Sequence, residues 1–184
     1  MMNHLKHISP ADYVMHYRSQ GMALTIGGRI LREASAVNLI RRLNDTLDTG
    51  VFSAVAQNLL EITADQWDRI EIGLRLGFAS HMVAVRVSAE KAEAWLELQS
   101  ATGLGYSATV DAGDSFYVLF RCETEHCTVR GQIAEGITLL SEGDVIKLPP
   151  FIDSRGEHGC WLGEDPILPF PELLSELANG SCAA

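Results

Sequence analysis

The feature that most constrains the fold is a run of short apolar segments that begins at residue 70. Residues 70–77 alternate in the two-residue period of a half-buried strand. Residues 82–87 form a second, more continuously apolar strand. Ser88 then provides an N-cap for a helix over residues 89–101, which ends at Gly103. The pattern predicts two strands followed by a helix.

More strands follow the helix, each separated from the next by turn residues such as Asp, Gly and Ser. We predict these strands at 106–110, 115–121, 137–140, 144–148 and 159–162. A last helix is predicted over 171–177. Strands grouped in this way around one helix are typical of an α+β fold with a mixed sheet, and they argue against a repeating βαβ chain.

Residues 1–69 have a mainly helical pattern. Ser9 and Pro10 suit the start of a helix that ends at Gly21, and a short strand is expected over 22–26. Helical spacing returns in three further segments, 33–47, 51–60 and 63–67. At 184 residues the chain fits one domain, with a helical part over 1–69 and a sheet-rich part over 70–178.

Charge and hydropathy narrow the functional classes. The net charge is −10 and the pI is near 4.9, which argues against nonspecific nucleic-acid binding but leaves room for a local basic site. No stretch approaches the roughly 20 apolar residues of a membrane span, and the first residues lack a signal-peptide core. We therefore expect a cytoplasmic protein with no membrane association, whose four cysteines are thiols.

A series of weak motifs follows in a fixed order from Gly73 to Leu162. The motifs are Gly73-Leu74-Arg75-Leu76-Gly77, the apolar strand 82–88, the Trp95 helix, Thr109-Val110, the strand 114–121, Gly136-Ile137-Thr138, Val145-Ile146-Lys147-Leu148-Pro149-Pro150 and Gly159-Cys160-Trp161-Leu162. This order resembles the N-terminal catalytic domain of bifunctional DNA primase/polymerases, the prim-pol branch of the archaeo-eukaryotic primase superfamily. The resemblance implies an RRM-related mixed β-sheet flanked by helices, with an N-terminal helical portion.

The residues that the resemblance aligns with the family's active site have the wrong chemistry. Arg86 and Ser88 stand at the two acidic positions of the first motif, and Thr138 stands at the third. Tyr117 replaces the histidine expected to contact a nucleotide phosphate. Nucleotidyl transfer needs two divalent cations held by carboxylates, and Arg86 puts a positive charge where a cation would bind. The resemblance thus predicts no catalytic residues, no metal and no cofactor.

An alternative hypothesis is that the chain is an active enzyme with displaced metal ligands. Acidic residues in nearby turns are candidates for displaced Mg²⁺ or Mn²⁺ ligands: Asp111, Asp114, Glu123, Glu142 and Asp144. The interpretation we favour is that they form turns, as Asp commonly does.

Arg86 has two interpretations. The one we favour is a salt bridge to a turn acid such as Asp114 or Glu123. In the other, Arg86 and Arg121 together hold a phosphate, because a guanidinium binds phosphate in a bidentate fork without a metal.

Candidates for nucleotide or DNA binding follow from the same motifs. They are Arg86, Ser88, Phe116, Tyr117, Arg121 and Lys147. Of the aromatic residues, Phe116 and Tyr117 are better stacking candidates than the three tryptophans, because the resemblance implies that their strand lines a nucleotide cleft. We expect Trp67, Trp95 and Trp161 in the core.

A zinc site is a further possibility that the spacing does not favour. The residues concerned are Cys122, His126, Cys127, His158 and Cys160. Cys-x4-Cys and His-x-Cys match no regular structural-zinc pattern, so buried thiols are the expected outcome.

Three functional hypotheses follow. The first is a catalytically inactive prim-pol-like domain that serves as an accessory or regulatory module in DNA replication and binds single-stranded DNA, a nucleotide or a replication protein. The second is an active nucleotidyltransferase with rearranged Mg²⁺ or Mn²⁺ ligands. The third is a pure protein-interaction domain.

Overall fold

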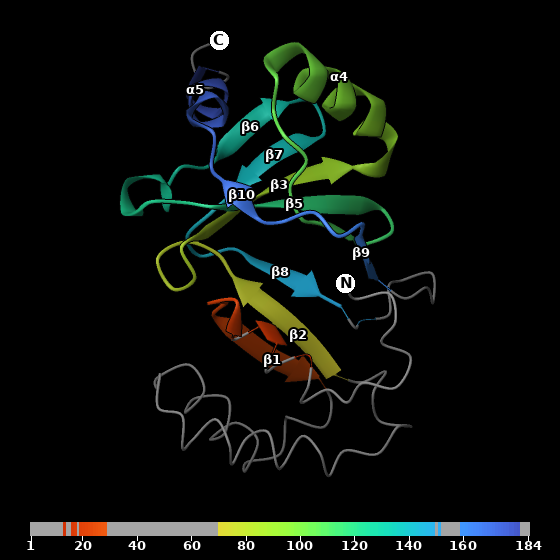
Figure 1. Ribbon diagram of the computed structural model, residues 1–184, viewed down its shortest axis with the longest axis vertical. Helices are drawn as coiled ribbons and strands as arrows, with labels where there is room; N and C mark the ends of the chain where they lie inside the picture. The colour runs from red at the N-terminus through yellow and green to blue at the C-terminus, as the bar shows by residue number, and fades with distance from the viewer. Residues whose placement is uncertain are drawn as a thin grey trace.

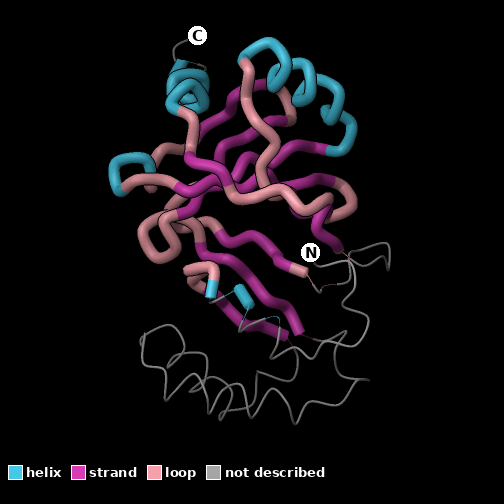
Figure 2. Tube along the Cα trace, viewed as in Figure 1, coloured by secondary structure: helices cyan, strands magenta, loops and turns pink. Residues whose placement is uncertain are grey.

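The computed structural model describes residues 13, 16, 17, 19–28, 70–149, 151 and 159–180. Within them, helices, a larger sheet and a smaller sheet form successive layers (Figures 1 and 2). The fold is α+β, as the sequence predicts. No described helix has both the length and the apolar character needed to cross a membrane.

The larger sheet has the strand order β6-β7-β3-β5-β4-β9. Its strands are β3 (Met82–Ser88), β4 (Thr109–Asp111), β5 (Ser115–Arg121), β6 (Gly131–Ala134), β7 (Ile137–Leu140), β9 (Cys160–Leu162) and β10 (Leu168–Pro169). One edge of β5 pairs with β3 along its whole length, while its other edge is shared by antiparallel β4 and parallel β10. The single parallel pair makes the sheet mixed.

Helices cover one face of the larger sheet. Val83, Val85 and Val87 of β3 point to this face, where they are fully buried. The short 3-10 helix η3 (Ala89–Lys91) leads into α4 (Ala92–Thr102), and α5 (Glu172–Gly180) follows β10. Trp95 of α4 and Leu174 of α5 complete this core.

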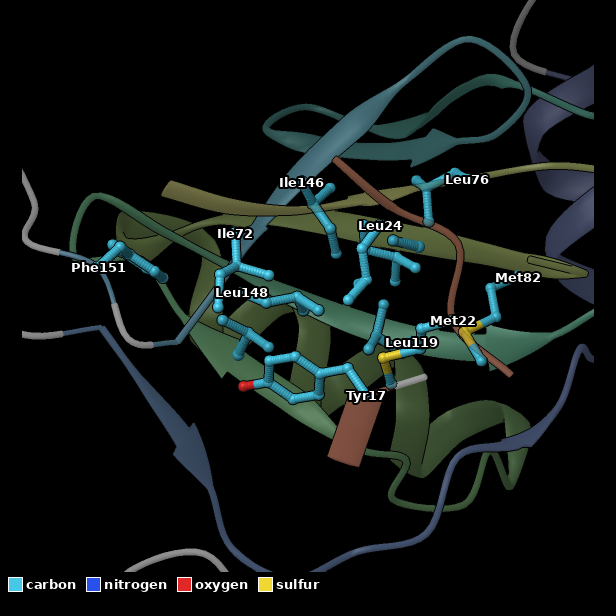
Figure 3. Packing of buried hydrophobic residues seen from close by; sticks show 13 residues of the cluster. Tyr17, Met22, Leu24, Ile72, Leu76, Met82, Leu119, Ile146, Leu148 and Phe151 are labelled. Atoms are coloured by element: carbon cyan, nitrogen blue, oxygen red, sulfur yellow. The ribbon is translucent and has the colours of Figure 1, made fainter. Parts of the chain in front are cut away.

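The smaller sheet covers part of the other face. Its strands, in the order β1-β2-β8, are β1 (Leu24–Gly28), β2 (Ile70–Arg75) and β8 (Val145–Leu148). Leu74 and Ile146 of this sheet form one core with Ala84 and Leu119 of the larger sheet, and Figure 3 shows this packing from close by.

Tyr17 ties the N-terminal segment to this core. Its ring is buried, and its hydroxyl donates to the Pro149 carbonyl and accepts from Trp161 Nε1 at 3.1 Å. Burial raises the pKa of the Tyr17 phenol well above its ordinary value. One side chain thereby links three segments that are far apart in the sequence.

The chain passes between the two sheets at a junction formed by the β2–β3 and β7–β8 turns. Gly77 in the first turn has φ +89°, and its Cα lies so close to the second turn that an added Cβ would come within 2.5 Å of Glu142 Cα. Phe78 N donates to Glu142 Oε2 at 2.7 Å. The two turns therefore pack directly against each other.

The predicted strands agree with the structure in type, and most of them differ from it at one or both ends. β5 and β7 have the predicted bounds, whereas β4 begins at Thr109 and not at 106. The backbone before β4 bonds elsewhere: Ala108 N donates to the Pro166 carbonyl. Strands β6 and β10 were not predicted: β10 has two residues and contains a proline, and the alternation in β6 was not recognised as a strand. The helices predicted over 33–47, 51–60 and 63–67 lie outside the described residues.

Candidate functional site

Strand register places three of the sequence-predicted site residues side by side. Arg86 of β3 is directly opposite Tyr117 of β5 on one side and Thr138 of β7 on the other. Gln132 of β6 is in turn opposite Thr138. Directly opposed residues of antiparallel strands share a face, with Cα atoms about 4.5–5.5 Å apart. We call Gln132, Thr138, Arg86 and Tyr117 the Arg86 row.

The Arg86 row lies on the face of the larger sheet that the smaller sheet partly covers. Two residues before Arg86 on the same face, Ala84 is fully buried under the smaller sheet. Arg86 and Gln132 themselves are exposed, and Thr138 and Tyr117 are half-buried. The polar row therefore begins where the apolar cover ends.

Ser88 continues the same face one step beyond the row. It pairs with the buried Ser115 of β5, and its backbone N donates to the Gly136 carbonyl at 2.9 Å. Gly136 has φ +73°, and a Cβ added to it would lie 3.4 Å from Ser88 Oγ, so the β6–β7 turn lies against this end of β3. Half-buried Ser88 adds a hydroxyl group to the site.

Arg86 does not form the salt bridge that the sequence analysis favours. Within the part of the chain that the structure describes, its guanidinium pairs with neither Asp114 nor Glu123. Asp114 Oδ1 instead accepts a hydrogen bond from Ser115 Oγ at 2.9 Å. The reason is geometric: Asp114 immediately precedes Ser115, which faces Ser88, and it is three residues from Tyr117, which faces Arg86. The exposed guanidinium is thus available to an external anion.

The other binding candidates lie elsewhere. Phe116 points to the helix-covered face, because it is adjacent to Tyr117 on a strand whose side chains alternate. Arg121 is opposite Met82, four residues from Arg86 along β3, which is roughly 13 Å. Arg121 Nη2 also donates to the Gln20 carbonyl at 3.2 Å. Lys147 belongs to β8 of the smaller sheet.

These positions bear on two of the candidate pairs. The alternation places the Phe116 and Tyr117 rings on opposite faces of the sheet. The register places Arg86 and Arg121 toward opposite ends of the β3–β5 pair, and the Arg121 guanidinium bonds the Gln20 carbonyl.

The turn acids are engaged in local bonds. Asp144 Oδ2 bonds Arg130 Nη2 at 3.0 Å and Ser141 N at 2.9 Å. Asp111 Oδ1 accepts from Gly113 N at 2.8 Å. Among the described residues, no group of three or more His, Cys, Asp or Glu side chains is arranged to hold a metal ion. These contacts agree with the interpretation of the acids as turn formers.

The cysteines and tryptophans are placed as follows. Cys122 and Cys127 are buried thiols in the helix-side core, and Cys160 is exposed on β9. Trp95 is buried in the core, as predicted, and Trp161 packs half-buried against the core beneath the smaller sheet. Trp67 and His158 lie outside the described residues.

Sequence reasoning missed Gln132 as a member of the row, because it did not predict β6. The available signal was the alternation Gln132-Ile133-Ala134 between Gly131 and the turn at Gly136. In comparisons with known proteins, no family model matches the chain and no curated protein matches it significantly.

Proposed function

We propose that this chain binds the phosphate groups of single-stranded nucleic acid at the Arg86 row and does not catalyse phosphoryl transfer there. The observation that carries the proposal is an exposed arginine in the middle of a polar row on the face of a sheet. Arg86 has no ion-pair partner among the residues described. An exposed arginine that no described carboxylate neutralises can bind an external anion.

The neighbours of Arg86 supply chemistry suited to a phosphate and its nucleoside. A guanidinium donates two parallel hydrogen bonds to phosphate oxygens. Thr138 and Gln132 offer a hydroxyl and an amide on one side of Arg86, and Tyr117 offers an aromatic ring on the other. Aromatic rings on a sheet surface provide stacking for bases without sequence preference.

The resemblance to prim-pol domains supports the choice of nucleic acid over other anions. The residues of the row that it aligns are those where the family has its acids and its histidine: Arg86, Tyr117 and Thr138. With Arg86 in place of a metal ligand, a cleft that holds phosphate through metal ions would hold it directly. We propose an accessory or regulatory role in DNA replication on the same ground.

The overall charge limits the strength of such binding. At a net charge of −10, the protein repels a polyanion at long range, so the contact must be short-ranged and local. We expect weak binding with a shallow salt dependence, because the site neutralises few phosphates.

The test is fluorescence anisotropy of a labelled single-stranded oligonucleotide, titrated with the protein at two salt concentrations, with and without Mn²⁺. Arg86→Ala should weaken binding about tenfold or more, since a hydrogen-bonded charge contributes about 1.5–3 kcal/mol. It should also reduce the slope of log K against log salt by about 0.7, the value for one phosphate of a single strand.

Arg130→Ala is the matched control, because it removes the same charge from an exposed arginine that is paired with Asp144. Equal binding by the parent and Arg86→Ala would contradict the proposal. Binding that requires Mn²⁺ would favour the rearranged enzyme, and absence of binding at low salt would favour a protein-interaction domain. A parallel titration with a labelled nucleotide separates a mononucleotide site from a strand-binding site.

A further inference from the structure

Two buried thiols lie in contact away from the Arg86 row. Cys122 follows β5 and Cys127 follows the 3-10 helix η4 (Thr124–His126), and their Sγ atoms are 3.2 Å apart. Cys122 is 7% exposed and Cys127 is 0% exposed. The binding proposal makes no use of this pair.

The pair is bonded to both turns of the junction between the sheets. Cys122 N donates to the His81 carbonyl of the β2–β3 turn at 2.9 Å. Glu142 N of the β7–β8 turn donates to the Cys127 carbonyl at 2.9 Å. Figure 1 shows the loop after β5 at the same end of the molecule as these two turns. The six-residue segment from Cys122 to Cys127 therefore connects two crossings of the chain between the sheets, β2 to β3 and β7 to β8.

We propose that Cys122 and Cys127 form a reversible intramolecular disulfide, and that this bond stiffens the junction between the two sheets. A disulfide has an S–S length of about 2.05 Å, so the sulfurs must approach by about 1.2 Å. The intervening 3-10 turn is exposed over Glu123, Thr124 and Glu125, so it can adjust without disturbing either sheet.

The oxidant in this proposal is a small peroxide. The Cys122 sulfur attacks one oxygen of hydrogen peroxide, the O–O bond breaks, and the departing hydroxide takes up the thiol proton as water. The Cys127 sulfur then attacks the sulfenic acid at Cys122, and its hydroxyl leaves with the Cys127 proton as a second water. Two thiols thus lose two electrons, and one peroxide becomes two waters.

Burial determines how readily Cys122 and Cys127 react. Desolvation, together with the contact with Cys127, raises the pKa of the Cys122 thiol to about 12. At neutral pH Cys122 is therefore in the thiol form, so its reaction with peroxide is slow. The same burial slows attack by reductants on the disulfide, so the bond is reversed slowly once it has formed. A metal is a poorer explanation, since no further His, Cys, Asp or Glu ligands gather around the pair within the described ranges.

Trypsin makes the test direct. Cleavage after Arg121 and Arg130 releases residues 122–130, which contain Cys122 and Cys127 and no other cysteine. The reduced protein is treated with hydrogen peroxide, alkylated under denaturing conditions, digested and analysed by mass spectrometry. We expect this peptide to become unalkylated and two hydrogens lighter than its reduced form, and to become doubly alkylated again after dithiothreitol.

Stability gives the second readout. Peroxide should raise the thermal midpoint of the parent and of Cys160→Ser, which lacks only an exposed thiol, and should not raise that of Cys127→Ser. Sulfinic acid on the 122–130 peptide, or its two cysteines remaining alkylatable while Cys160 is oxidised, would overturn the proposal. A disulfide without any rise in the midpoint would overturn the stiffening of the junction. None of these outcomes depends on nucleic-acid binding.

Discussion

The two faces of β3 differ in burial and in polarity. On the helix-covered face, Val83, Val85 and Val87 are all fully buried. On the other face, Met82 and Ala84 are fully buried under the smaller sheet, but Arg86 is exposed and Ser88 half-buried. One face is apolar along its whole length. The other face changes from apolar to polar at the edge of the region that the smaller sheet covers.

This difference separates stability from binding within one strand. The apolar face removes side chains from water along its whole length, which is the main favourable term in folding. The polar end contributes little burial and presents Arg86 between Tyr117 and Thr138. Substitutions on the two faces should therefore affect different properties of the protein, and the first prediction below tests this division.

The largest expected effect comes from placing the same charged residue on each face. Val85→Asp puts a carboxylate into a fully buried apolar site and should cost more than about 4 kcal/mol, enough to prevent folding. Arg86→Asp puts it on the exposed face and should cost about 1 kcal/mol or less. Urea unfolding followed by circular dichroism measures both. Similar losses of stability would contradict the division of the strand.

The second effect concerns the junction between the sheets. Gly77→Ala forces a positive φ on alanine and drives its Cβ against the Glu142 backbone, so it should destabilise the protein by about 3 kcal/mol. Gly143 has nearly the same φ, +90°, with no atom within 4 Å of an added Cβ. Gly143→Ala should therefore cost only about 1–2 kcal/mol, and the difference in unfolding free energy reports the close contact. Equal costs for the two variants would refute a tightly packed junction.

The third effect concerns Tyr17, which anchors the N-terminal segment to the core between the two sheets. Tyr17→Phe removes the hydroxyl that satisfies the Pro149 carbonyl and Trp161 Nε1, and should cost about 1–3 kcal/mol in chemical unfolding. Tyr106→Phe is the control, because Tyr106 is 68% exposed. If both variants were as stable as the parent, Tyr17 would not anchor the N-terminal segment.

The smallest effect lies at the surface ion pair near Ser88. Lys91 Nζ is 2.9 Å from Glu135 Oε2, and this contact lowers the pKa of Glu135. A lowered carboxyl pKa stabilises the fold above the unfolded pKa, and the contribution is lost as pH falls through the folded pKa. In an NMR titration, Lys91→Ala should raise the pKa of Glu135. An unchanged value would mean that the pair does not persist in solution.

Local patterns in the sequence predicted much of the sheet. β5 contains five consecutive apolar residues, 116–120, and β7 lies between Gly136 and the turn at Gly143, so both strands have clear ends. β10 is too short for such a pattern, and it depends on pairing with the distant β5. Pairing of this kind is a property of tertiary structure.

The site was only partly predictable for the same reason. The resemblance identified Arg86, Tyr117 and Thr138 individually, and strand register shows that they are adjacent. Strand alternation alone was sufficient to separate Phe116 from Tyr117. The absence of a salt bridge between Arg86 and the described turn acids could not be read from the sequence, because it depends on where the turn before β5 directs Asp114.

The most direct test of the central claim is an NMR titration of the ¹⁵N-labelled protein with a short single-stranded oligonucleotide. The account predicts chemical-shift changes centred on Arg86, Tyr117, Thr138 and Gln132 that disappear in Arg86→Ala and persist in Arg130→Ala. Changes centred on α4 and α5 with the Arg86 row unaffected would contradict it, since they would place the ligand on the opposite face of the same sheet.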